Sequence, residues 1–296
     1  MNSHTATEEE KEALEKYFVQ YLNLEKRYPL LPGIENEEAV AHLMGLDKKE
    51  LTNLRSRFCK NAREAAVELL EDEHIAKWID MIPFEKDDTI VALGDSLTDD
   101  LQGWFSIFRH ALDITVPGAD YTFINSGIAN NTTTDALRRL NRDVLAHEPD
   151  WVIVALGTFD AQRLHAAPGR PITSLADFWE NLNNIQEAVE EVSDNPITWI
   201  TPPPVITELM QQMQFFDFTI EEKDLEQFRE VITGKKGYMV DPKSERMGGN
   251  PPEAWNYLGD GLHPSLSGQV NTAREVIKAL ALAEESEGAE FSDMED

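Results

Sequence analysis

Three residues in this chain have the types and spacing needed for acyl transfer. Ser96 follows a short apolar run, residues 89–93, at a turn that begins at Gly94. A serine at a strand-to-helix turn lies where developing negative charge is favoured. Asp260 and His263 lie three residues apart, so the carboxylate can reach one ring nitrogen and leave the other free. We therefore expect a nucleophile, a base and an acid that orients the base.

Two more polar loops should lie near these residues. Asn125-Ser126-Gly127 ends one apolar segment, and Gly157-Thr158-Phe159-Asp160 follows another. Ligands of open α/β sheets bind outside the carboxyl ends of the strands. All of these loops are therefore expected at one edge of a sheet.

Strand and helix patterns alternate from about residue 86. The clearest helix covers 174–192, where Ser174 is the expected N-cap, and a last helix covers 267–283. Such alternation predicts a parallel sheet with helices on both faces. The expected strands are 89–93, 121–125, 151–156, 197–201 and 238–240.

The chain divides into three predicted parts. Residues 1–85 form an all-helical N-terminal extension, residues 86–285 form the catalytic domain, and residues 286–296 form an acidic, disordered tail. A capping box at Asp47 and Glu50 opens one helix of the extension. The extension either packs on the next domain or joins copies of the chain into a homo-oligomer.

Composition narrows the function classes. The 296 residues carry a net charge of −29, which argues against nucleic-acid and membrane partners. The acidic N-terminus lacks an apolar signal segment, and the single cysteine rules out an internal disulfide, so we expect a cytoplasmic protein. The histidines outside position 263 show no metal-ligand spacing. We expect neither a metal nor another cofactor.

Three blocks of the sequence resemble the SGNH, or GDSL, hydrolase family. They are Gly94-Asp95-Ser96-Leu97, Asn125-Ser126-Gly127 and the Asp-x-x-His-Pro block from Asp260 to Pro264. The resemblance implies a flavodoxin-like three-layer α/β/α sandwich with a five-stranded parallel sheet. It also implies that Ser96 is the nucleophile, His263 the base and Asp260 its partner. The backbone N–H groups of Ser96 and Gly127 would be the oxyanion donors.

The third block departs from the family pattern Gly-x-Asn-Asp. Phe159 stands where the family has an asparagine that donates to the oxyanion. Losing one such donor costs roughly 3 kcal/mol, or a hundredfold in rate. Asn130 and Asn131 are candidate replacements. We expect Phe159 and Trp255 to line the substrate pocket, and residues 203–237 to form either a lid or simple packing over the sheet edge.

The sequence thus predicts a serine esterase that cleaves a small-molecule carboxylic ester of small or medium size. The alternative is a catalytically weak or inactive relative that binds a ligand or a partner, which Phe159 and the extension favour. Phosphoryl transfer through Asp95 is disfavoured, because Leu97 stands where that chemistry needs a second acid.

Overall fold

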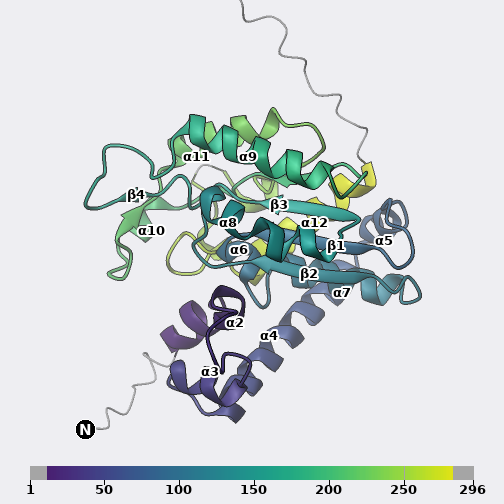
Figure 1. Cartoon of the computed structure of the whole chain (residues 1–296), viewed down its shortest axis with the longest axis horizontal. Helices are drawn as coiled ribbons and strands as arrows, with labels where there is room; N and C mark the ends of the chain where they lie inside the picture. The colour runs from purple at the N-terminus through teal and green to yellow at the C-terminus, as the bar shows by residue number, and fades with distance from the viewer. Residues whose placement is uncertain (1–11, 250, 283–296) are drawn as a thin grey trace, which may run out of the picture.

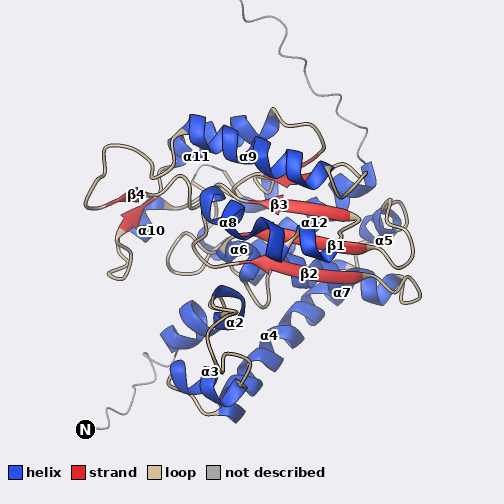
Figure 2. Cartoon of the chain, viewed as in Figure 1, coloured by secondary structure: helices blue, strands red, loops and turns tan. Residues whose placement is uncertain are grey.

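A five-stranded parallel sheet forms the centre of the molecule. The computed structural model describes residues 12–249 and 251–282, so the predicted acidic tail lies outside the described residues. The strand order is β2-β1-β3-β5-β7, and every pairing is parallel (Figure 2). The predicted fold class is confirmed. The strands are β1 (Thr89–Gly94), β2 (Thr122–Gly127), β3 (Trp151–Ala155), β5 (Thr198–Ile200) and β7 (Tyr238–Val240).

The carboxyl ends of the central strands are level with one another. Gly94 of β1 pairs with Gly127 of β2 on one side and with Ala155 of β3 on the other. The loops that leave these strands therefore start at one edge of the sheet. This register gathers the polar residues that the sequence scatters over more than 60 positions.

Helices cover both faces of the sheet (Figure 1). Alternate residues of β1 point to opposite faces, as strand geometry requires. Val91 and Leu93 join one hydrophobic cluster, and Ile90 and Ala92 join the other. One face carries α8 (Thr133–Asp143), α9 (Leu175–Glu190) and α11 (Glu222–Thr233), and the other carries α4 (Lys48–Leu69), α5 (Glu73–Ile79), α7 (Trp104–Thr115) and α12 (Leu266–Leu282).

Side-chain caps set where the major helices begin. The predicted capping box of α4 is present, with Asp47 accepting from the Glu50 N–H and the Glu50 carboxylate accepting from the Asp47 N–H. Ser174 caps α9 as expected, by accepting from the Asp177 N–H. These bonds satisfy N–H groups that have no partner inside the helix.

The N-terminal extension is helical, as predicted, but it does not form one separate body. Its first part has a small core that includes Val19, Val40 and Phe58. From Ala62 onward its apolar residues belong to the same cluster as the sheet, through the end of α4 and through α5. The elements of the first part are η1 (Glu15–Val19), α2 (Leu24–Arg27) and α3 (Glu37–Leu43).

The long insertion between β5 and β7 packs mainly against the sheet layer. Met210 and Phe216 are buried in the cluster beneath α9 and α11. Phe215 remains half exposed and contacts the ring of Tyr17 in the extension, with the ring centroids 5.3 Å apart. The insertion contains α10 (Thr207–Met210) and β6 (Phe218–Thr219), and β6 pairs antiparallel with β4 (Arg163–Leu164) from the segment after β3.

Short elements complete the connections. They are α6 (Ser96–Asp99), η2 (Leu145–His147), η3 (Glu245–Met247) and η4 (Ala254–Asn256). No helix of the described residues combines the length and the apolar character needed to cross a bilayer.

Candidate active site

Ser96 is the first residue of α6, directly after β1 and a single turn residue. Asp95 caps this short helix, its Oδ1 accepting from the Leu97 N–H at 2.9 Å. Gly94 is required because a Cβ there would lie 2.2 Å from Thr98 Oγ1 and 3.1 Å from the Ala155 carbonyl oxygen. The N–H of the first helical residue has no acceptor within its helix. The turn thus presents both the hydroxyl and the N–H of Ser96.

Asp260 and His263 form a buried pair in the loop before α12. Asp260 Oδ2 lies 2.7 Å from His263 Nδ1, and Asp260 Oδ1 accepts from the N–H groups of Leu262 and His263, each at 2.9 Å. These contacts fix the ring and leave Nε2 for a substrate-side partner. Gly261 makes this tight loop possible. Its φ is +67°, and a Cβ at this position would lie 2.5 Å from the Ile206 carbonyl oxygen.

The electrostatics of the pair favour an ionised carboxylate. Burial opposes the charge on Asp260, but the charge of His263 and the hydrogen bonds from His263 and Leu262 outweigh it and lower the pKa of Asp260. A buried anion against one ring nitrogen would stabilise an imidazolium. The arrangement suits a histidine that gains and loses a proton.

The Ser96 hydroxyl hydrogen bonds to Asn130 in the loop after β2. The Asn130 N–H donates to Ser96 Oγ at 2.9 Å, and Ser96 Oγ donates to Asn130 Oδ1 at 3.3 Å. Among the described residues, the hydroxyl makes no hydrogen bond to His263. Asn130 has φ at +61°, a left-handed conformation that asparagine tolerates better than most residues.

The Gly127 N–H does not face Ser96. It donates to Oδ1 of Asn125 in its own strand at 2.9 Å. Gly127 is instead needed for space, because a Cβ there would lie 2.5 Å from the Asp99 nitrogen. The backbone donor that reaches the hydroxyl belongs to Asn130, three residues later. The oxyanion role expected for Gly127 therefore lacks geometric support in this structure.

Arg139 of α8 holds the ends of β1 and β2 together. Its guanidinium donates to the carbonyl oxygens of Gly94 at 2.9 Å and Ser126 at 2.6 Å. It also donates to Asn131 Oδ1 at 2.7 Å. Arg139 thus holds the Asn131 side chain through its oxygen and fixes the loop after β2.

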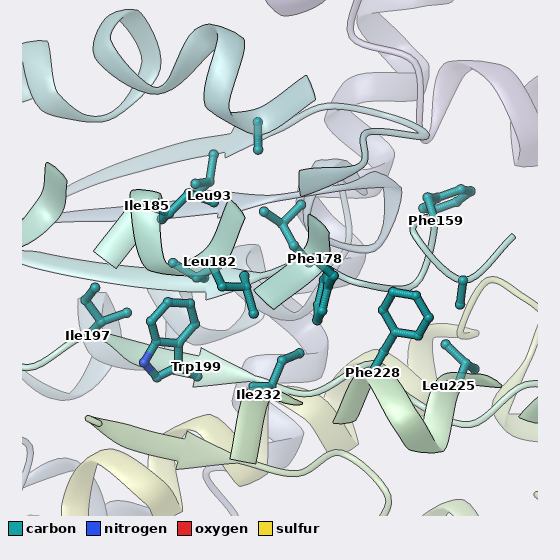
Figure 3. Close-up of a cluster of buried hydrophobic side chains, with 14 of the residues drawn as sticks. Leu93, Phe159, Phe178, Leu182, Ile185, Ile197, Trp199, Leu225, Phe228 and Ile232 are labelled. Carbon is teal, nitrogen blue, oxygen red and sulfur yellow. The ribbon is translucent and has the colours of Figure 1, made fainter. Parts of the chain in front are cut away.

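Phe159 is a core residue and not part of an open pocket. Its ring is fully buried and meets Phe218 edge to face, with the centroids 6.2 Å apart. It lies in the cluster drawn in Figure 3, on the side that includes Phe178 and Phe228. The expectation that Phe159 lines the substrate pocket is therefore wrong. Trp255, in contrast, is 62 % exposed, so its predicted role in substrate binding stays a prediction.

Asp160, which we did not assign to the chemistry, has a structural role. Its carboxylate accepts from the Thr133 N–H at 3.0 and 3.1 Å and from Thr133 Oγ1 at 2.6 Å. Burial raises the pKa of Asp160 to about 6, and the Thr133 bonds partly offset this effect. These bonds tie the loop after β3 to the start of α8.

Other buried acids surround the nucleophile. Burial raises the pKa of Asp95 to about 7, although the Leu97 N–H and the charge of His263 oppose the shift. Burial also raises the pKa of Asp100 to about 6, with hydrogen bonds from Gln102, Gln20 and Gln269 opposing it.

The N-terminal extension contributes residues that sequence reasoning missed. The Tyr21 ring packs on the His263 ring with the centroids 4.3 Å apart, and both residues are buried. Lys26 forms an ion pair with Asp99 and donates to Asn125 Oδ1 at 3.1 Å. Arg27 donates to the Ala129 carbonyl oxygen at 2.8 Å. No local motif marks these residues, because their partners lie about 70 to 240 positions away.

The described residues contain no group of three or more His, Cys, Asp or Glu side chains arranged to hold a metal ion. The chemistry that the site offers is that of its own side chains: a hydroxyl, an imidazole paired with a buried carboxylate, and backbone N–H donors. Together these groups are suited to attack on an acyl carbon.

Comparison with known proteins finds similar esterases and a similar lipase/acylhydrolase. An arylesterase from Vibrio mimicus is 28 % identical over 203 residues, which cover 64 % of this chain and 87 % of that protein. The solved structure of an acetylxylan esterase from Geobacillus stearothermophilus aligns with a TM-score of 0.51 at 19 % identity, covering 69 % of this chain and 97 % of that one. A lipase/acylhydrolase from Enterococcus faecalis aligns with a TM-score of 0.51 at 22 % identity, covering 66 % and 95 %.

The two structures share the fold with this chain. The model of the GDSL-like lipase/acylhydrolase family matches residues 92–270, more than half of the chain. That match begins within β1 and ends within α12, so it includes the Ser96 turn and the Asp260–His263 loop. The chain therefore belongs to the GDSL-like lipase/acylhydrolase family of ester hydrolases.

Proposed function

We propose that this protein hydrolyses a carboxylic ester of small or medium size through an acyl-enzyme on Ser96. The observation that carries the proposal is the buried Asp260–His263 pair, 2.7 Å apart, in a loop whose Pro264 lines one pocket with Asp95 and Leu97, the two neighbours of Ser96. A histidine held in this way can act as a general base with a fixed tautomer.

Four steps describe the proposed reaction. His263 Nε2 takes the proton of Ser96 as Oγ attacks the acyl carbon. His263 then gives that proton to the leaving alcohol oxygen, which breaks the ester bond and leaves an acyl group on Oγ. Water, deprotonated by the same nitrogen, attacks the acyl carbon. Collapse of that second intermediate releases the carboxylic acid and returns the proton to Ser96.

The hydroxyl must turn before the first step. At rest it donates to Asn130 Oδ1, so it must leave that acceptor and turn its proton toward His263 Nε2. Catalytic hydrogen bonds are often loose before substrate binds and tighten in the complex.

Two backbone donors are proposed for the oxyanion, the N–H groups of Ser96 and Asn130. The Asn130 N–H supports this choice because it already lies 2.9 Å from Ser96 Oγ. The third donor of the family pattern, an asparagine side chain, is replaced by Phe159, which faces the core. We therefore expect a slower enzyme than one with three donors, by roughly a hundredfold.

The test is hydrolysis of p-nitrophenyl acetate and p-nitrophenyl butyrate by the wild type, Ser96→Ala and His263→Ala. We expect kcat/KM to fall by about 10³-fold or more in either variant relative to the wild type. Unchanged hydrolysis by Ser96→Ala would contradict the proposal.

The alternative is an inactive family member that binds a ligand or a partner. Phe159 favours it, and so does the resting hydrogen bond of Ser96 to Asn130 instead of to His263. Absence of hydrolysis in the wild type at every pH, in a protein that is folded by circular dichroism, would support this alternative.

A further inference from the structure

Residues 20–27 of the N-terminal extension lie against both halves of the candidate active site. Tyr21 packs on the His263 ring, and Arg27 reaches the loop after β2. Figure 1 shows α2, which contains Arg27, next to the edge of the sheet where the strands end. In the sequence, α2 precedes the first strand by more than 60 residues. The extension is therefore more than a distant appendage of the catalytic domain.

One peptide group connects Arg27 to the nucleophile. Arg27 Nη1 donates to the carbonyl oxygen of Ala129 at 2.8 Å. The N–H of the same peptide group is that of Asn130, which donates to Ser96 Oγ at 2.9 Å. The guanidinium and the hydroxyl thus bind opposite ends of one planar amide, whose orientation they define together.

A charged donor at that carbonyl has two effects. It fixes the rotation of the amide plane, which otherwise depends on the uncommon φ of Asn130. It also polarises the amide, because a charged donor at one end of a chain of hydrogen bonds strengthens the next bond, and both bonds of this amide are partly buried. Both effects increase the ability of the Asn130 N–H to stabilise negative charge where the oxyanion forms.

The segment that carries Arg27 is firmly anchored. Lys26 pairs with the buried carboxylate of Asp99, and Asn23 Nδ2 donates to the same carboxylate at 2.6 Å. Gln20 Nε2 donates to the buried Asp100 at 3.0 Å. If the segment detached, the buried carboxylates of Asp99 and Asp100 would lose these partners, which is costly for a buried charge. Arg27 is therefore held in place independently of its bond to Ala129.

We propose that Arg27 is a positioning residue for ester hydrolysis, which holds and polarises the Ala129–Asn130 peptide so that the Asn130 N–H stabilises the oxyanion. The inference rests on the proposed function and adds a role for the N-terminal extension. It makes the extension a contributor to the transition state and not only to folding.

The first test compares three variants by kcat and KM for p-nitrophenyl acetate. Arg27→Met keeps the stem and removes the charge, and we expect kcat to fall about ten- to a hundredfold with KM little changed. Arg27→Lys restores a charge with poorer geometry and should recover part of kcat. The matched control is Arg55→Met, which removes a 2.6 Å bond to Glu25 of the same segment without touching the site. It should keep the kcat of the wild type.

The second test measures the affinity for a trifluoromethyl ketone that forms a tetrahedral adduct with Ser96. A positioning role predicts that Arg27→Met weakens this inhibitor by the same factor as it lowers kcat/KM, since both depend on the oxyanion. A merely structural role predicts lower thermal stability with unchanged kcat and unchanged inhibitor affinity. That second result would overturn the inference.

The outcomes separate the two proposals. If the wild type is active and Arg27→Met behaves like Arg55→Met, only the role of Arg27 fails. If the folded wild type neither hydrolyses the ester nor binds the ketone, the proposed function and the inference fail together.

Discussion

The two sides of Ser96 are built in different ways. On the base side, Asp260 and His263 lie in one loop, and the contacts between them span three residues. On the proposed oxyanion side, the proposed donor is the backbone N–H of Asn130, whose peptide group Arg27 of the extension contacts, and it is flanked by Asn131, which Arg139 holds. The base side is local and made of side chains, whereas the oxyanion side is assembled from distant segments.

This difference predicts that the base side is more sensitive to a single substitution than the oxyanion side. A side chain that does chemistry can be removed by one substitution. A backbone N–H survives almost any substitution at its own position, so its function is changed mainly through its conformation and its neighbours.

The largest effect should come from the base side. Asp260→Asn removes the charge that faces His263 and leaves the ring free to adopt the wrong tautomer. We expect kcat to fall by about 10⁴-fold. Hydrolysis of p-nitrophenyl acetate by the folded variant checks this, and a loss smaller than tenfold would show that the pair is structural only.

The next largest effect is on stability and concerns Phe159. Phe159→Asn places an amide in the apolar cluster beside Phe218 and leaves a cavity. We expect a loss of about 3–5 kcal/mol in the free energy of unfolding and no gain in kcat. Urea unfolding and ester hydrolysis measure the two quantities. A higher kcat would mean that this position can supply the missing oxyanion donor after all.

A smaller effect separates the backbone of Asn130 from its side chain. Asn130→Gly keeps the N–H and suits the left-handed φ, whereas Asn130→Val keeps the N–H but strains that conformation. We expect Asn130→Val to lose about ten- to a hundredfold in kcat and Asn130→Gly to lose much less. If kcat fell equally in both variants, the Asn130 side chain, and not its backbone N–H, would be the group that supports catalysis.

The smallest effect concerns Asp95, which lies between the two sides. Burial raises its pKa to about 7; the charge of His263 opposes that shift and the charge of Asp160 adds to it. A carboxyl whose pKa is raised on folding contributes stability at low pH that is lost as the pH rises through the folded pKa. The unfolding free energy of the wild type should therefore fall relative to Asp95→Asn between about pH 5 and pH 8.

Urea unfolding of both proteins at the two pH values measures this difference. We expect a relative change of at least about 1 kcal/mol, since one pKa unit corresponds to about 1.4 kcal/mol. The Asn side chain can still accept from the Leu97 N–H, so the helix cap is kept. Parallel pH dependence in the two proteins would contradict the raised pKa.

Much of the fold could be predicted because its signals are local. The strand at residues 89–93 and the caps at Asp47 and Ser174 follow from a few neighbouring residues, and all are confirmed. The short pair of β4 and β6 carries no such signal, since two residues in each strand leave no periodicity. Packing of the insertion decides that pairing.

The site could be predicted only in part, for the same reason. Residue type and spacing indicate Ser96, Asp260 and His263. The family resemblance also implied Gly127 as a backbone donor. In the structure Gly127 has a packing role, and the N–H that donates to Ser96 is that of Asn130. Which N–H points inward depends on the φ of a loop, and the contacts of Tyr21 and Arg27 depend on the tertiary fold. The predicted cytoplasmic location and oligomer formation through the extension stay predictions.

The central claim is that Ser96 is an activated nucleophile. Labelling by a fluorophosphonate probe, followed by mass spectrometry of the labelled peptide, tests it most directly in the wild type and Ser96→Ala. We predict a covalent adduct on Ser96 in the wild type and none in the variant. Labelling of both proteins, or of neither, would contradict the claim.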